Sequence, residues 1–282
     1  MDILEKILAG INNLPTLPTI YSTLSEAIED PNTNTEKLAK IISTDQVSSL
    51  KILKVANSPF YGFNGRIDNI TQAILYLGFR EVKNIVFAIT VINFFSKDKE
   101  QSRFRPVEYW AHSIGVGIAT RMIGSIANEN KLENYFLAGI FHDIGKLLFS
   151  EFAQREYSKV LEIVARNNCL IREAELEVFG IEHSKVGQIL SEKWKLPLSI
   201  QNAIYHHHEG ILEQTKDKLI ASVHVGDIIA RAMKLGYPGD TLIPEPNIKV
   251  WEILNVPDGA IKAMKKSLRS DFEQTVRLML VD

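Results

Sequence analysis

The sequence predicts an all-α protein in which an N-terminal helical bundle packs on a second helical core. Apolar residues recur every three to four positions along most of the chain, which is the period of a half-buried helix. Helix-start signals precede several of these stretches, and signals for strand hairpins are absent. Together these observations favour helices throughout.

The expected helices follow one another along the chain. Residues 30–36 read Asp-Pro-Asn-Thr-Asn-Thr-Glu and offer several N-caps before the first apolar stripe. Residues 197–199 read Pro-Leu-Ser and open a later helix near Ile200. The stretch Ile85–Phe95 is too short to span a bilayer and predicts a buried helix. The apolar stripes are Leu38, Ile41 and Ile42; Leu50, Leu53 and Val55; and Ile114, Ile118, Met122 and Ile126.

The amino-acid composition limits the kinds of partner that the protein is expected to bind. The 282 residues carry 32 basic and 34 acidic side chains, a net charge of −2. Without a cationic excess, binding to DNA or to an anionic membrane is not expected. The N-terminus has no signal-peptide pattern, and the single cysteine, Cys169, cannot form an internal disulfide. These features fit a reducing cytoplasm, with Cys169 expected as a small buried apolar residue.

Three segments are expected. Residues 1–103 form the N-terminal bundle, ending in the charged run 97–103, which is polar enough for a surface connection. Residues 104–235 hold the histidine-rich core. The Gly- and Pro-containing stretch 236–246 then opens a C-terminal helical tail, 236–282.

The strongest chemical signal is the dipeptide His142-Asp143 at the end of the apolar run 138–141. An imidazole and a carboxylate side by side supply one nitrogen and one oxygen ligand, which suits a divalent cation that polarises water. A buried Asp143 without a partner would be costly. Gly145 is expected to break the helix after the pair. Alone, the dipeptide also fits a helix-end histidine and a capping aspartate.

Other residues with ligand chemistry lie on either side of this pair. His112 is expected on an apolar helix with Glu108 one turn earlier, although a hydrogen-bonded core histidine is an alternative. Consecutive helical residues diverge by about 100°, so only part of the run His206-His207-His208 can point inward. The further candidates are His183 before an amphipathic helix, Asp227 in an apolar helix, and His224, expected as a structural or second-layer residue.

This order of motifs resembles the HD superfamily of metal-dependent phosphohydrolases, and in particular its two-metal branch. The resemblance implies that His112, His142, Asp143, His183, His207, His208 and Asp227 are metal ligands. It favours His207 with His208 over His206 with His207, places Lys146 near the phosphate, and sets the family's additional glutamate at Glu108. No Gly-Tyr-Pro signature follows His208-Glu209, so hydrolysis of cyclic di-GMP is not implied.

The N-terminal half resembles the HDOD family, the HD-related output domain of bacterial signalling systems. The resemblance covers roughly residues 10–230 and rests on Leu14–Pro18, on Asp45 to Ala56-Asn57-Ser58, and on residues 73–78, Ala-Ile-Leu-Tyr-Leu-Gly. Many members of that family have lost the ligand set, whereas this sequence keeps it.

Two hypotheses follow from the resemblance. In the first, the chain hydrolyses a nucleotide or other phosphate ester with two divalent ions, iron, manganese or similar. Asp143 bridges the ions and the water between them attacks phosphorus. In the second, it is a non-catalytic signalling module with a structural metal and a protein partner on the N-terminal bundle. A signalling role with retained metal binding is favoured, and it leaves room for phosphohydrolase activity, since a hydrolase can act in signalling.

Overall fold

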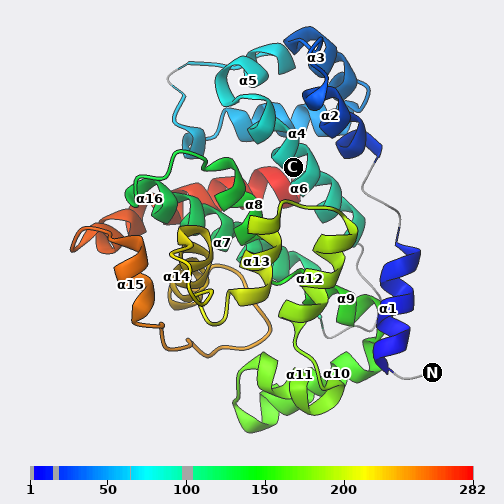
Figure 1. Ribbon diagram of the computed structural model, residues 1–282, viewed down its shortest axis with the longest axis vertical. Coiled ribbons are helices and arrows are strands. Elements are labelled where there is room, and N and C mark those ends of the chain that lie inside the picture. The colour runs from blue at the N-terminus through cyan, green and yellow to red at the C-terminus, as the bar shows by residue number, and fades with distance from the viewer. Residues whose placement is uncertain (1–2, 15–18, 64, 97–103, 282) are drawn as a thin grey trace. The chain divides into compact units, whose positions relative to one another are not determined.

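The computed structural model describes residues 3–14, 19–63, 65–96 and 104–281, and over these residues it consists of helices joined by loops, with no strand (Figure 1). The prediction of an all-α protein is confirmed. The motif segment 15–18 and the charged run 97–103 lie outside the described residues. Among the described helices, none has the length and apolar character needed to cross a membrane.

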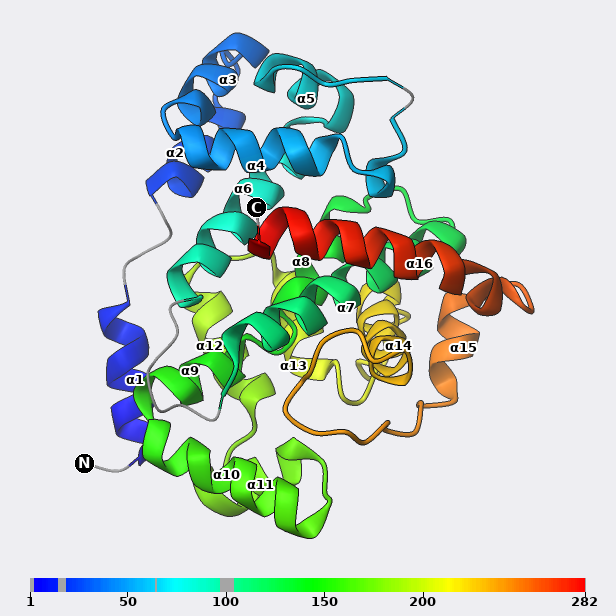
Figure 2. The ribbon, with the colours of Figure 1, turned by 180° about the vertical axis from the view of Figure 1, so that it is seen from behind.

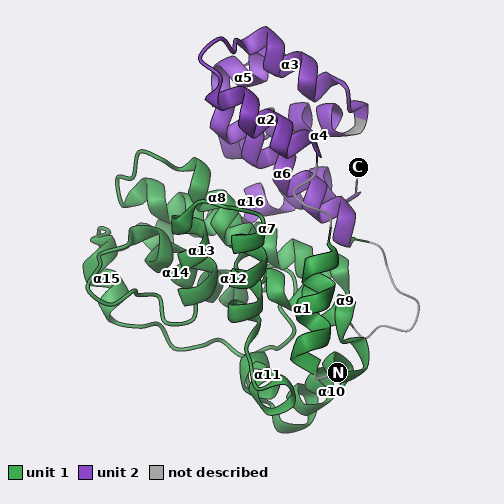
Figure 3. Cartoon of the chain, turned by 45° about the vertical axis from the view of Figure 1, so that its right-hand side comes forward, with its two compact units in different colours: residues 1–14, 96–268 green, residues 15–95, 269–282 purple. Residues whose placement is uncertain are grey.

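The chain folds into two compact units, each made of separate stretches of sequence (Figure 3). Unit 1 comprises residues 1–14 and 96–268, and unit 2 comprises residues 15–95 and 269–282. These bounds differ from the expected segments 1–103, 104–235 and 236–282. The first helix and most of the C-terminal segment belong with the histidine-rich core, and only the last residues belong with the N-terminal bundle.

Unit 2 is a bundle whose local structure follows the sequence signals. Its helices are α2 (Thr19–Glu29), α3 (Thr35–Ser43), α4 (Gln46–Ala56), η1 (Pro59–Tyr61), α5 (Ile70–Leu77), α6 (Phe79–Phe95) and η2 (Arg277–Val281). Asn34 caps α3 by accepting a hydrogen bond from the Lys37 amide, as the residues before that stripe predict. Most of α6 from Val82 to Phe95 is buried, so the apolar stretch is a core helix.

Unit 1 contains the remaining helices. They are α1 (Ile3–Asn13), α7 (Pro106–Ile126), α8 (Glu133–Phe141), α9 (Ile144–Phe152), α10 (Gln154–Asn167), α11 (Ile171–Phe179), α12 (His183–Lys193), α13 (Leu198–His206), α14 (Lys218–Ala232) and α15 (Lys249–Leu254). The last helix, α16 (Ala260–Val276), begins in unit 1 and ends in unit 2. The Pro-Leu-Ser signal is confirmed as the start of α13.

Two kinds of contact hold α1 to unit 1 although it is far from that unit in sequence. Ile7 and Ile11 are almost completely buried. Lys193, at the end of α12, donates hydrogen bonds from Nζ to the carbonyl oxygens of Ile11, Asn12 and Leu14 (2.5, 2.8 and 2.9 Å). One ammonium group thus satisfies carbonyls that the end of α1 leaves unpaired. Residues 1–14 therefore belong to unit 1 and not to the N-terminal bundle.

The centre of unit 1 is formed by α7, α8 and α14, which lie side by side (Figure 2). Glycines allow the closest of these approaches. A Cβ atom added to Gly139 of α8 would lie 2.6 Å from the Cα atom of Gly117 on α7, closer than such atoms can pack. Because α7 carries His112 and α8 leads into His142, this crossing sets how close the two histidines lie.

Two details of unit 1 correct the sequence analysis. Gly145 does not break a helix: the break comes at His142 and Asp143, between α8 and α9, and Gly145 lies in the first turn of α9. Its role is close approach, because an added Cβ would overlap the carbonyl oxygen of His183 at the start of α12. Cys169 is partly exposed in the connection between α10 and α11, so the expectation of a buried cysteine is wrong.

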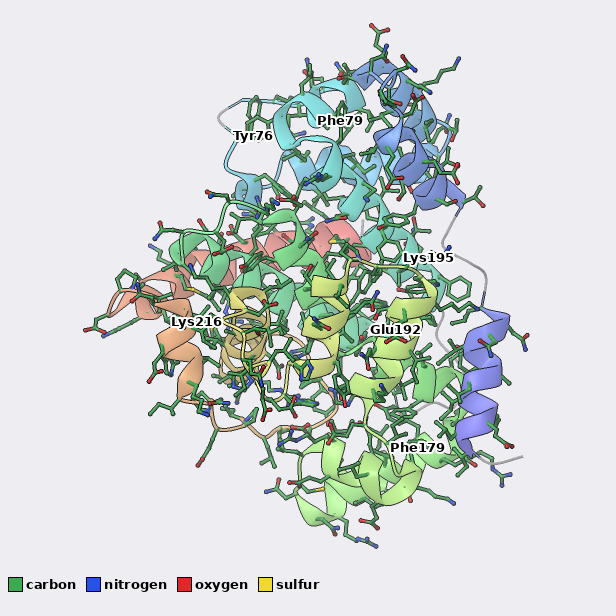
Figure 4. All side chains as sticks on the ribbon, in the orientation of Figure 1. Tyr76, Phe79, Phe179, Glu192, Lys195 and Lys216 are labelled. Atoms are coloured by element: carbon green, nitrogen blue, oxygen red, sulfur yellow. The ribbon has the colours of Figure 1, made fainter. Side chains whose placement is uncertain are left out.

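We expect Gly139→Ala to lower the free energy of unfolding by about 1–3 kcal/mol, because the methyl group overpacks the crossing of α7 and α8. Chemical denaturation followed by circular dichroism measures the effect. The matched control is Glu192→Ala, which removes an exposed side chain of α12 (Figure 4) and should change stability by less than about 0.5 kcal/mol. Equal stability of Gly139→Ala and the unaltered protein would contradict this account of the crossing.

Candidate metal centre

Five regions of unit 1 bring histidine and aspartate side chains to one buried place. The side chains are His112 from α7, His142 and Asp143 from the junction of α8 and α9, His183 from the start of α12, His207 and His208 from the end of α13, and Asp227 from α14. All are buried except His208, which is of intermediate exposure.

His112 and Asp227 face each other across the α7–α14 contact. The Nδ1 atom of His112 lies 3.2 Å from the carbonyl oxygen of Leu235, to which it can only donate a proton. Burial lowers the pKa of His112, which favours the neutral ring. A neutral ring that donates from Nδ1 keeps a lone pair on Nε2, and this atom lies 3.0 Å from Oδ1 of Asp227.

His142 and His207 repeat this arrangement around Asp143. Their Nδ1 atoms donate to the backbone carbonyls of Gly139 (2.7 Å) and Ile204 (2.8 Å). Their Nε2 atoms lie 3.3 and 3.5 Å from the two carboxylate oxygens of Asp143 and make no hydrogen bond within the described structure. Burial lowers the pKa of His207 to about 4, so its ring is neutral near pH 7.

His183 is oriented by a carboxylate instead of a backbone carbonyl. Glu175 of α11 is completely buried, and its Oε2 atom accepts from the His183 ring Nδ1 (2.6 Å) and from the His183 amide (2.9 Å). The Nε2 atom of His183 then lies 2.9 Å from Oδ1 of Asp143 and 3.1 Å from Nε2 of His208. Although burial alone would lower the pKa of His183, the charge of Glu175 raises it to about 9.

The sequence analysis did not single out Glu175. The available signal was its place on the apolar face of α11, where it is buried beside Ile171 and Ala174, while Glu173 and Glu177 of the same helix are exposed. A glutamate at such a position needs a partner. Which partner it finds depends on the turn that follows α11, which the sequence does not specify.

These donors fit a divalent cation. Lone pairs on the Nε2 atoms of neutral histidines repel carboxylate oxygens at about 3 Å unless a cation lies between them. The Nε2 atoms of His142 and His207 also lack hydrogen bonds among the described residues. Ligand atoms within 4.8 Å of one another form three groups: His183, His207 and His208; His112, His142 and Asp227; and His142, Asp143 and His207.

The carboxylates also touch cations of the chain itself. Lys146 is completely buried, and its Nζ atom donates to Oδ2 of Asp143 and to the Pro238 carbonyl (2.5 and 3.1 Å). Burial alone would raise the pKa of Asp143, but neighbouring His142 and Lys146 hold it well below its usual value. Lys146 therefore lies inside the cluster, at Asp143, and not at the protein surface.

Arg231 forms an ion pair with Asp227, as Lys146 does with Asp143. Arg231 was not among the residues predicted from the sequence. Its Nε atom lies 3.0 Å from both carboxylate oxygens of Asp227, one helical turn earlier on α14. Its Nη1 atom donates to Asp240 (2.8 Å). The i,i+4 spacing of an aspartate and an arginine was the signal that could have identified this pair.

The remaining candidates from the sequence lie apart from the clusters. His206 is partly exposed and its Nδ1 atom lies 4.0 Å from Glu209, so the structure gathers His207 with His208, not with His206. His224 donates from Nδ1 to the His207 carbonyl and accepts at Nε2 from the Asn247 amide. His224 therefore fixes the backbone at His207 and at Asn247. Glu108 forms an exposed ion pair with Arg105.

The segment 233–248 closes one side of the centre, although the stretch 236–246 within it was expected only to open a C-terminal helical tail. It supplies the carbonyl of Leu235 to His112, the carbonyl of Pro238 to Lys146 and the carboxylate of Asp240 to Arg231. Gly236 has a φ of 69°, and an added Cβ would overlap the His112 amide. Only glycine permits this backbone so close to α7.

A cavity of about 190 Å³ opens beside the cluster, and Asp240, Pro244 and Glu245 of the segment 233–248 form part of its wall. His207, His208 and Asp227 contribute to its wall together with Arg172 and Arg231. Three of the clustered side chains can therefore be reached by a small molecule.

Helices arranged around a buried cluster centred on a His-Asp dipeptide define the class of HD-related helical proteins. The chain belongs to the HDOD family: the HDOD domain model matches residues 14–210. The family expected from the sequence motifs is confirmed.

Individual relatives share the fold at low identity. An HDOD domain protein of Geobacter sulfurreducens is 24% identical, with a TM-score of 0.84 over 99% of this chain and 98% of that one. A "Putative phosphohydrolase" of Shewanella amazonensis SB2B is 19% identical, with a TM-score of 0.75 over 97% and 98%. An uncharacterized protein of Treponema pallidum (strain Nichols) is 23% identical over 93% of this chain. The chain spans about half the length of that relative.

We expect Glu175→Gln to weaken binding of a divalent metal by about 10- to 100-fold, because the carboxylate that orients His183 and raises its basicity is lost. Titration with Mn²⁺ monitored by calorimetry measures this. Glu177→Gln, an exposed change on the same helix, should leave the affinity unaltered. Unchanged affinity in Glu175→Gln would show that Glu175 does not support the centre.

Metal affinity should also rise with pH between about 6.5 and 8.5. Because the pKa of His183 in the metal-free protein is about 9, a metal that binds its Nε2 atom displaces a proton throughout this range. One displaced proton predicts about a tenfold gain in affinity per pH unit. The same titration at several pH values checks the slope, and an affinity independent of pH would mean that His183 carries no displaceable proton.

Proposed function

We propose that this HDOD protein binds divalent metal at the His/Asp cluster and hydrolyses a phosphate ester in a bacterial signalling system. One observation carries the proposal. The Nε2 atoms of His142 and His207 are buried without hydrogen bonds beside Asp143, and His207 also borders a cavity. Ligand atoms held ready next to an open space suit a centre that acts on a bound molecule.

The proposed ligand sets follow the clusters. His112, His142, Asp143 and Asp227 would hold one ion, and His183, His207 and His208 a second, with Asp143 shared between them. Nitrogen and oxygen donors together suit iron, manganese or a similar ion. Such ions, when bound, acidify a water molecule and neutralise charge on a phosphoryl group.

The residues around the ligands prepare this chemistry. Backbone carbonyls of Gly139 and Ile204 and the carboxylate of Glu175 fix their histidine rings with Nε2 inward. Lys146 would assist electrostatically by placing a positive charge at Asp143, within the centre. It does not border the cavity, so this role does not require contact with the phosphate.

A non-catalytic signalling module is the second candidate, and a specific observation favours it. Lys146 and Arg231 form ion pairs with Asp143 and Asp227, so the chain supplies its own counter-charges to both carboxylates. A fold balanced in this way is stable without relying on metal for charge compensation. In that case unit 2 would provide the surface for a protein partner in the cytoplasm.

Metal analysis and activity assays on Asp143→Asn distinguish these candidates. The amide keeps the shape of the side chain but removes the shared anionic ligand, so metal content and hydrolysis of phosphate esters should both fall by at least about 100-fold. Elemental analysis and assays with added Mn²⁺ or Fe²⁺ measure the two quantities. The control is Asp258→Asn, an exposed change in the same unit.

Each outcome has a distinct meaning. Full metal content in Asp143→Asn would show that the ligand assignment is wrong. Metal bound to the unaltered protein, with no turnover of a broad panel of nucleotides and other phosphate esters, would contradict the hydrolase and leave the signalling module.

A further inference from the structure

Two cavities meet beside the cluster, both lined by residues of unit 1. The inner cavity of about 190 Å³ borders His207 and Asp227, and the outer one has a volume of about 740 Å³. They share Arg172, His208, His224 and Glu245 in their walls. The two cavities therefore adjoin, and together they offer room for a phosphorylated small molecule.

The inner end of this site suits an anion. Arg172 is half-buried at the junction and pairs with no carboxylate among the described residues. His207 is completely buried, and its Nε2 atom has no hydrogen-bond partner. A guanidinium group beside a centre for divalent ions attracts a phosphoryl group.

The outer cavity carries the opposite charge. Four carboxylates line it and Arg172 is the single lysine or arginine in its wall: Glu182, Glu209, Glu213 and Glu245 are the acidic residues. His206, His208 and His224 also border this cavity, and the Nδ1 atom of His206 lies 4.0 Å from Glu209. Lys185 lies over the Tyr205 ring but does not border the cavity.

We propose, on the basis of the function proposed above, that the substrate is a phosphomonoester whose alcohol part carries a positive charge, such as a phosphorylated amino alcohol or amino sugar. The phosphoryl group lies at the inner end beside Arg172, and the cationic group lies among the glutamates. With divalent ions bound at the cluster, the inner end is cationic and the outer cavity is acidic, which is the order of charge that complements such a molecule.

The same arrangement disfavours polyanions. A dinucleotide or a nucleoside triphosphate that placed one phosphate at the inner end would bring further negative charge against the four carboxylates. Opposite charges in a partly exposed site attract by an amount that corresponds to about a three- to tenfold change in affinity, and like charges repel to a similar extent.

Binding of three matched probes to the full chain loaded with Mn²⁺ tests this inference by calorimetry. The probes are O-phosphoethanolamine, glycerol 3-phosphate and 3-phosphoglycerate, whose alcohol parts are cationic, neutral and anionic. We expect O-phosphoethanolamine to bind about three- to tenfold more tightly than glycerol 3-phosphate, and 3-phosphoglycerate to bind least tightly. Higher salt should reduce these ratios.

Variants assign the effect to its residues. Glu213→Gln combined with Glu245→Gln should bring the affinities of the cationic and neutral probes to within about twofold. Glu252→Gln, an exposed change on α15 outside both cavities, should preserve their ratio. Arg172→Gln should weaken all three probes by a similar factor, because each contains the phosphoryl group.

Equal binding of the three probes, or a preference for the anionic one, would overturn the inference. So would an additional Mn²⁺ ion that binds the unaltered protein but not the double glutamine variant, because the glutamates would then hold metal and not substrate. Metal and probes that bind without turnover would overturn the proposed hydrolase, while the affinity ratios still decide the charge preference. A chain that takes up no Mn²⁺ or binds no probe would contradict both.

Discussion

The buried carboxylate of Asp143 is the constraint on which the rest of unit 1 depends. Its charge lies in the interior, completely shielded from solvent, where an uncompensated anion would be very costly. The fold answers with two cationic partners, Lys146 and His183, and it also brings the Nε2 atoms of His142 and His207 to the same carboxylate, where a divalent ion would hold them. Three separate regions of the chain must meet for this: residues 142–146, the start of α12 and the end of α13.

The backbone takes a direct part in preparing the cluster. His112, His142 and His207 each donate from Nδ1 to a backbone carbonyl, so the position of a helix end or loop decides which nitrogen faces the carboxylates. Gly145 and Gly236 allow backbone to pass beside His183 and His112, respectively. An arrangement fixed by backbone and glycines is rigid, which suits a centre that must hold a molecule in one orientation.

Helical periodicity was sufficient to predict the all-α class, whereas the HDOD family and the set of clustered residues came from the resemblance of the sequence motifs to known families. Neither was sufficient for Glu175, because this buried charge finds its partner His183 through the turn between α11 and α12. Arg231 had a local signal, its i,i+4 spacing from Asp227, but that spacing alone does not show that the pair is buried. The same limit explains Gly145, whose contact with α12 has no local signature. The packing of α1 in unit 1 depends on Lys193, which lies more than 170 residues further along the chain. No change in composition along the sequence indicates so distant a contact.

A crystal structure of the Mn²⁺-loaded protein, with anomalous scattering measured near the manganese edge, tests the central claim most directly. The account predicts two anomalous peaks on either side of Asp143, one contacted by Nε2 of His112 and His142 and the other by Nε2 of His183, His207 and His208. Peaks only at surface carboxylates, or histidines that contact the ions through Nδ1, would contradict it.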